Sequence, residues 1–196
     1  MKLFNSVYNT ILENVVGSEP ADNQPQDGAE NIWTPERVSG LVELVRGSLR
    51  QANPYFWHLL KSMPIKIVAP NSEIQTAAVD QYRNLYFNPV FVQQILDHYE
   101  TGKENKVTGT DPFTYLVAHE IYHVVNRTFE RQKGRNIVLV GAGGNQGTLW
   151  NVATDFEMND ELSWRWGLTP PTINGRQVGC LTDKDGNAMF NGKKYN

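Results

Sequence analysis

The sequence contains little cysteine, no long apolar run and no excess of basic residues, and each shortage excludes a class of protein. The single cysteine, Cys180, cannot form an internal disulfide, which excludes a small secreted scaffold held by such bonds. No apolar run approaches the roughly 18–20 residues that span a bilayer, and the first residues lack the pattern of a signal peptide. With 18 basic and 21 acidic residues the net charge is −3, which argues against a dedicated nucleic-acid binder. We therefore expect a cytoplasmic protein whose partners include neither nucleic acid nor membrane.

Two segments are expected along the chain. Residues 1–31 combine an amphipathic helix with a polar linker rich in proline, glycine and acidic residues. This N-terminal helix is a candidate docking segment for a protein partner. Residues 32–196 are expected to form one domain, because 40% of the residues of the chain are apolar and a chain of this length can bury a sizeable core.

Helical and strand-like patterns alternate along the expected domain. Apolar spacing and capping residues predict helices at about 34–49, 55–60, 89–96, 112–132 and 148–166. Alternating or continuous apolar runs predict strands at 65–68, 76–79, 84–87 and 137–140, of which the middle two form a hairpin. This order of elements predicts an α+β fold, with a small antiparallel sheet packed on helices.

The segment His119–His123 has the pattern H-E-x-x-H and lies on the predicted helix 112–132. Residues i and i+4 lie about 40° apart around a helix, so both imidazoles project from one face. Two neutral imidazoles at this spacing can share one tetrahedral Zn²⁺. Glu120 borders the same face, in position to take a proton from a water at the metal. The motif therefore predicts a zinc site with His119 and His123 as ligands and Glu120 as general base.

A catalytic zinc site uses a third protein ligand and leaves one position open for water. No histidine follows His123 in the sequence, so we expect a carboxylate from the last predicted helix. Asp155 shares a polar face of that helix with Asn151 and Asn159. Glu157 is the alternative, and the residues alone leave both carboxylates open.

These two helices together resemble a known family. LVAHEIYHVV, followed by LWNVATDFEMNDEL, is similar to the metallopeptidase domain that precedes a von Willebrand A-like domain in certain bacterial and phage proteins. The resemblance covers about residues 34–171. It implies a zincin-like fold in which His119, His123 and Asp155 bind the metal and Glu120 is the base. It also favours Asp155 over Glu157 as the third ligand.

The glycine-rich run at 141–147 resembles a nucleotide-binding loop but departs from both common patterns. A Rossmann fingerprint needs a small residue where Gln146 stands, and a P-loop needs lysine where Thr148 stands. We interpret the run as a flexible loop near the site. Nucleotide binding through this run is kept as a hypothesis that ranks below the two described next.

The leading hypothesis is a zinc-dependent metallopeptidase, a hydrolase that cleaves a peptide or protein substrate. The substrate is expected to lie along an edge strand, for which Asn84–Asn88 is the candidate. The donor that stabilises the oxyanion is left open among Tyr86, Tyr122 and Arg127. The alternative hypothesis is a metal-containing protein-interaction module with little or no peptidase activity.

Overall fold

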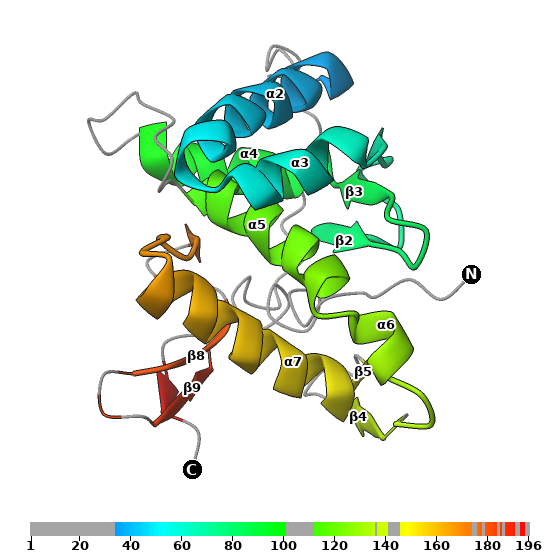
Figure 1. Ribbon diagram of the computed structural model, residues 1–196, viewed down its shortest axis with the longest axis vertical. Coiled ribbons are helices and arrows are strands. Elements are labelled where there is room, and N and C mark those ends of the chain that lie inside the picture. The colour runs from blue at the N-terminus through cyan, green and yellow to red at the C-terminus, as the bar shows by residue number, and fades with distance from the viewer. Residues whose placement is uncertain are drawn as a thin grey trace, which may run out of the picture.

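The computed structural model describes residues 34–100, 112–135, 137–140 and 146–173, together with 176–177, 179–183, 185, 187–190 and 193–194. The predicted N-terminal helix and linker, and residues 141–145 of the glycine-rich run, lie outside this part of the chain. A small three-stranded sheet lies beside helices at the right of Figure 1, and this combination confirms the α+β class.

The described chain begins with two helices that form one side of the core. Helix α2 (Pro35–Ala52) starts at Thr34, whose hydroxyl accepts the Arg37 N–H at 3.4 Å. Helix α3 (Pro54–Ser62) starts at Asn53, whose side chain accepts the Phe56 N–H at 3.2 Å. A cap followed by proline is the pattern that predicted the first of them. The buried face of α2 consists of residues three or four apart, namely Val38, Val42, Val45 and Leu49.

The central sheet is mixed rather than antiparallel. Its strands are β1 (Ile65–Ile67), β2 (Ala77–Val79) and β3 (Leu85–Phe87), in the order β1-β3-β2. Strands β2 and β3 form the predicted antiparallel hairpin, but β1 pairs with β3 in parallel, so the expected all-antiparallel sheet is wrong. The reason is topological: the connection after β1 carries the chain to the far side of β3 before β2 begins.

Because β3 is the central strand, the expected substrate edge at Asn84–Asn88 is also wrong: both edges of β3 are already paired. Strand β2 is the outer strand on the side of helix α5. The residues that flank it bond to the residues that flank β3: the Thr76 carbonyl accepts the Asn88 N–H at 2.7 Å, and the Asp80 N–H donates to the Asn84 carbonyl at 3.1 Å. Backbone groups alternate in direction along a strand, so Ala77 and Val79 direct theirs away from β3.

The predicted helix at 112–132 is two helices. Helix α5 (Pro112–Val125) is followed by α6 (Thr128–Arg131), and Arg127 between them has a left-handed backbone with φ of 51°. The Arg127 N–H closes the end of α5 on the Val124 carbonyl at 3.1 Å. Most of α5 is buried on all sides, since it crosses the middle of the core (Figure 1).

The last long helix, α7 (Leu149–Asp160), begins at the predicted cap Thr148, whose hydroxyl accepts the Asn151 N–H at 3.2 Å. It continues as a π-helical turn, η1 (Glu161–Arg165). Helix α4 and the remaining short strands complete the described elements: α4 (Pro89–Glu100), β4 (Val138–Val140), β5 (Gln146–Thr148), β6 (Thr172–Ile173), β7 (Arg176–Gln177), β8 (Cys180–Thr182), β9 (Ala188–Phe190) and β10 (Lys193–Lys194). The Asp160 carboxylate joins β8 to α7 by accepting the Thr182 N–H and hydroxyl, both at 2.7 Å. None of the helices described has both the length and the apolar character needed to cross a bilayer.

Candidate metal centre

Three side chains from two helices meet in the interior of the protein. His119 and His123 project from one face of α5, and Asp155 reaches them from α7, which passes beneath α5 in Figure 1. The two Nε2 atoms lie 3.2 Å apart, and Asp155 Oδ1 lies 3.6 Å from His119 Nε2 and 3.5 Å from His123 Nε2. Each of the three side chains is at most 2% exposed. The cluster is therefore a compact triangle of one oxygen and two nitrogen atoms shielded from solvent.

The size of this triangle fits one small metal ion. Zinc bonds of about 2.0–2.1 Å in a tetrahedral arrangement place neighbouring ligand atoms about 3.3–3.4 Å apart. The three edges here measure 3.2, 3.5 and 3.6 Å. Two imidazoles and one carboxylate are also ligands of the right chemical type, and three protein ligands leave a fourth position for water. His119, His123 and Asp155 thus form a candidate metal site.

Asn159 orients the first of the two histidines. Its Oδ1 lies 2.7 Å from His119 Nδ1, and the residue is 1% exposed. An amide oxygen only accepts, so His119 Nδ1 carries the proton and the Nε2 lone pair faces the cluster. The sequence placed Asn159 on the polar face of Asp155 but gave it no role. Its position one helical turn after Asp155 was the available signal.

Both histidines are held in their neutral form. Burial lowers the pKa of His119 to about 4, against the opposing effect of its hydrogen bond to Asn159. Burial also places the pKa of His123 well below its usual range, and the neighbouring His119 adds to this effect. At neutral pH both rings are therefore uncharged, which is the state in which imidazole binds metal.

Glu120 lies between this cluster and the outer strand of the sheet. Its carboxyl group accepts a hydrogen bond from the outward-facing N–H of Val79 in β2. The residue is 1% exposed, and its buried Oε1 has no hydrogen-bond partner in the described structure. Burial, and then the charge of Asp155, raise the pKa of Glu120 well above its usual value. The site thus combines a carboxyl group of unusual proton affinity with three potential ligands.

The rival carboxylates lie elsewhere. The Glu157 side chain is 56% exposed and lies 3.7 Å from the Arg131 guanidinium, outside the cluster. The Glu130 side chain is 58% exposed and lies 3.9 Å from Arg127. The structure therefore brings Asp155, and neither glutamate, to the two histidines.

The three candidates for the oxyanion donor have different surroundings. The Tyr86 hydroxyl donates to Asp80 Oδ2 at 3.0 Å, so its proton is already in use. The Tyr122 ring is half-buried and packs edge-on against Phe56, with the ring centroids 5.7 Å apart. Arg127 lies at the end of α5 with an exposed side chain. Tyr86 is thereby set aside, and Tyr122 and Arg127 stay open.

Comparison with known proteins identifies a family for most of the chain. Residues 43–175 match the family described as "Putative metallopeptidase domain". The matched range includes both histidines, Glu120 and Asp155. Searches among curated proteins and among solved structures gave no match. Because the family match covers more than half of the 196 residues, the chain belongs to this metallopeptidase-domain family.

Proposed function

We propose that this chain is a zinc-dependent peptidase with a zincin-like centre, in which His119, His123 and Asp155 hold the metal and Glu120 is the general base. One observation carries the proposal. The ligand triangle has edges of 3.2–3.6 Å, and a buried carboxyl group borders it on the same helix.

The donor set favours zinc over the common hard cations. Magnesium and calcium prefer shells made of oxygen ligands, whereas two imidazoles and one carboxylate suit zinc and its transition-metal neighbours. When bound, zinc supplies a Lewis acid that polarises a carbonyl group and lowers the pKa of water. The binding residues contribute rigidity: both histidines come from one buried helix, and Asn159 fixes the ring of His119.

Glu120 is the residue that moves the proton. The Val79 N–H holds the carboxyl group beside the cluster, and Oε1 is left to accept a proton from the attacking water. The same oxygen then returns that proton to the leaving amine. A general base works best when its pKa lies near the working pH, and a carboxyl group reaches that range when its pKa is raised. The burial of Glu120 supports this role.

The test begins with elemental analysis of the purified protein, followed by digestion of a peptide library with and without a chelator. We expect about one zinc per chain and cleavage that stops on chelation. Glu120→Gln should keep the metal and lower turnover about 10²–10⁴-fold, because an amide cannot accept the proton. Glu157→Gln, on the exposed side of α7, is the matched control and should cleave like the wild type.

Two outcomes count against the proposal. Equal cleavage by the wild type and the Glu120→Gln variant removes Glu120 from the role of base. A wild type that binds zinc but cleaves no peptide in the library contradicts the peptidase and favours the interaction module instead.

A further inference from the structure

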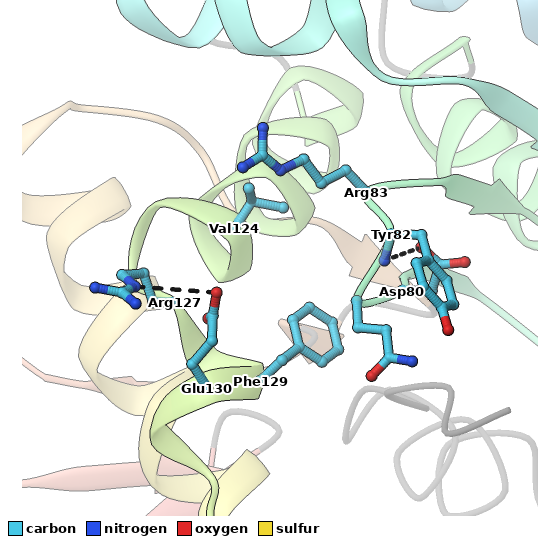
Figure 2. Close-up of a pocket in the computed structure, with 8 residues that line it drawn as sticks. Asp80, Tyr82, Arg83, Val124, Arg127, Phe129 and Glu130 are labelled. Atoms are coloured by element: carbon cyan, nitrogen blue, oxygen red, sulfur yellow. Dashed lines mark hydrogen bonds and ion pairs between the residues drawn. The ribbon is translucent and has the colours of Figure 1, made fainter.

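A pocket with a cavity volume of about 540 Å³ lies where the β2–β3 turn faces the end of α5. We propose that this pocket binds the carboxylate of an acidic residue in a peptide substrate, through Arg83 and Arg127. The inference rests on the proposed peptidase function, because it assigns a specificity to the same site. Figure 2 shows Arg83 extending from the turn over Val124, with Arg127 across the pocket.

The pocket adjoins the candidate metal centre through both elements that form its walls. Asp80 in its lining directly follows Val79, whose N–H binds Glu120. Val124 in its lining directly follows His123. One residue of extended chain spans about 3.3 Å. A peptide that lies over the metal centre therefore brings a side chain to this pocket within a few residues of the bond to be cleaved.

Both arginines have unusual backbones. Arg83 has φ of 66° and Arg127 has φ of 51°, and in the described chain no other non-glycine residue has positive φ. This left-handed conformation is unfavourable for a residue with a Cβ, and such residues concentrate at functional sites. Two separate segments thus adopt the same costly conformation and bring their cations to one pocket.

The carboxylate of Asp80 does not neutralise these cations by contact, because its hydrogen-bonding capacity is used within the turn. It accepts the Tyr82 N–H at 2.9 Å, the Asn84 N–H at 2.8 Å, the Asn84 side-chain amide at 2.7 Å and the Tyr86 hydroxyl at 3.0 Å. Asp80 therefore shapes the turn that presents Arg83 and leaves the guanidinium group available.

The remaining acidic group in the pocket forms only a weak pair. Glu130 lies 3.9 Å from Arg127, and the two side chains are 58% and 73% exposed. Such exposed pairs contribute little and are readily replaced. The Arg83 guanidinium group has no ion pair or hydrogen bond within the described structure. Both guanidinium groups are therefore available to a carboxylate of the substrate: Arg83 has no pair to break, and Arg127 has only a weak one.

The apolar part of the lining suits the stem of an acidic side chain. Phe129 lies between Glu130 and Asp80 in Figure 2, and it lines the pocket together with Val124. These groups can cover the methylenes of a glutamate while its carboxylate reaches the arginines. Charge-assisted contacts between guanidinium and carboxylate are the strong class of hydrogen bond and are geometrically specific.

The test measures binding separately from cleavage. The full chain carrying Glu120→Gln, loaded with zinc, is titrated by fluorescence anisotropy with peptides that differ only by Glu or Gln at each position in turn. We expect one position at which the Glu peptide binds about tenfold more tightly than the Gln peptide, with a preference that weakens as salt is added.

Arg83→Asn should abolish this preference without straining the fold, because asparagine tolerates a left-handed backbone. Arg127→Asn should reduce it, and Arg83→Lys should keep part of it. The matched control, Arg50→Gln, removes an equal charge from α2 and should change nothing.

Equal affinity for the Glu and Gln peptides at every position, including no binding of either, overturns the assignment of this pocket. A preference for Glu that survives both asparagine substitutions overturns it as well. The outcomes for the proposed peptidase are distinct: a wild type that shows the preference but never cleaves refutes the peptidase and retains the pocket. Cleavage without any preference for acidic residues refutes the pocket assignment and retains the peptidase.

Discussion

Replacing Asn159 by alanine tests whether the candidate metal centre depends on a residue that itself binds no metal. The substitution removes the oxygen 2.7 Å from His119 Nδ1 and leaves a buried N–H without its acceptor. An unsatisfied buried donor costs about 1–3 kcal/mol. Loss of a group that supports a metal ligand typically weakens metal binding about 10–100-fold, which is about 1.4–2.7 kcal/mol. The first cost lowers the free energy of unfolding with or without metal, whereas the second concerns metal binding itself, so we expect Asn159→Ala to bind zinc about 10–100-fold more weakly.

The measurement is a competition titration against a chromophoric chelator, with circular dichroism recorded on each variant to check folding. Asn159→Asp is the informative companion, because it keeps an oxygen acceptor and should retain most of the affinity. Glu157→Ala, on the exposed side of the same helix, should bind like the wild type. If Asn159→Ala folds and binds zinc as tightly as the wild type, the orientation of His119 does not depend on this hydrogen bond.

Three further predictions concern the ligands and the base. His119→Ala and His123→Ala should each abolish stoichiometric zinc, measured by elemental analysis, because two remaining ligands hold zinc poorly; full retention in either would contradict the site. Asp155→Ala should weaken zinc binding sharply while Glu157→Ala leaves it near normal, and the reverse order of affinities would move the third ligand to Glu157. Glu120→Gln should stabilise the metal-free protein at about pH 8 and leave it unchanged near pH 4. The reason is that a raised pKa in the folded state gives full stability below the unfolded value of 4.5 and loses it as the pH rises. Denaturant melts across this pH range measure the difference, and a difference that shrinks with rising pH would refute the argument.

Local patterns predicted the helices well, because capping and apolar spacing are properties of neighbouring residues. The caps Thr34 and Thr148 each accept the backbone N–H that the pattern implies. The break between helices α5 and α6 at Arg127 could not be predicted from capping or apolar spacing. Arginine is a good helix former, so nothing in its local sequence signals a left-handed backbone. The parallel pairing of β1 was missed for a similar reason, since strand order depends on how the whole chain packs.

In the candidate site too, some features follow from local sequence and others depend on how the chain packs. The spacing of His119 and His123 follows from helix geometry, so a sequence reader can place both on one face. The approach of Asp155 depends on how α7 packs against α5, which left Glu157 open until the structure showed it exposed. The Val79 N–H that binds Glu120 is a backbone group, so the residue type at position 79 does not signal this contact. Its direction follows only from the pairing of β2 with β3.

The two helices of the candidate metal centre are far apart in sequence, since α6, β4, the glycine-rich run and β5 lie between His123 and Asp155. A metal held at both ends acts as a cross-link, and closing a loop of this size costs an unfolded chain an entropy that grows only with the logarithm of its length. Each doubling of the loop adds about 0.6 kcal/mol. The glycine-rich run at 141–147 lies within this loop, and its sequence contains no histidine, cysteine, aspartate or glutamate. Insertions ahead of β5 should therefore cost the site little, because they lengthen this loop and leave the cap Thr148 and helix α7, which carries Asp155, unchanged.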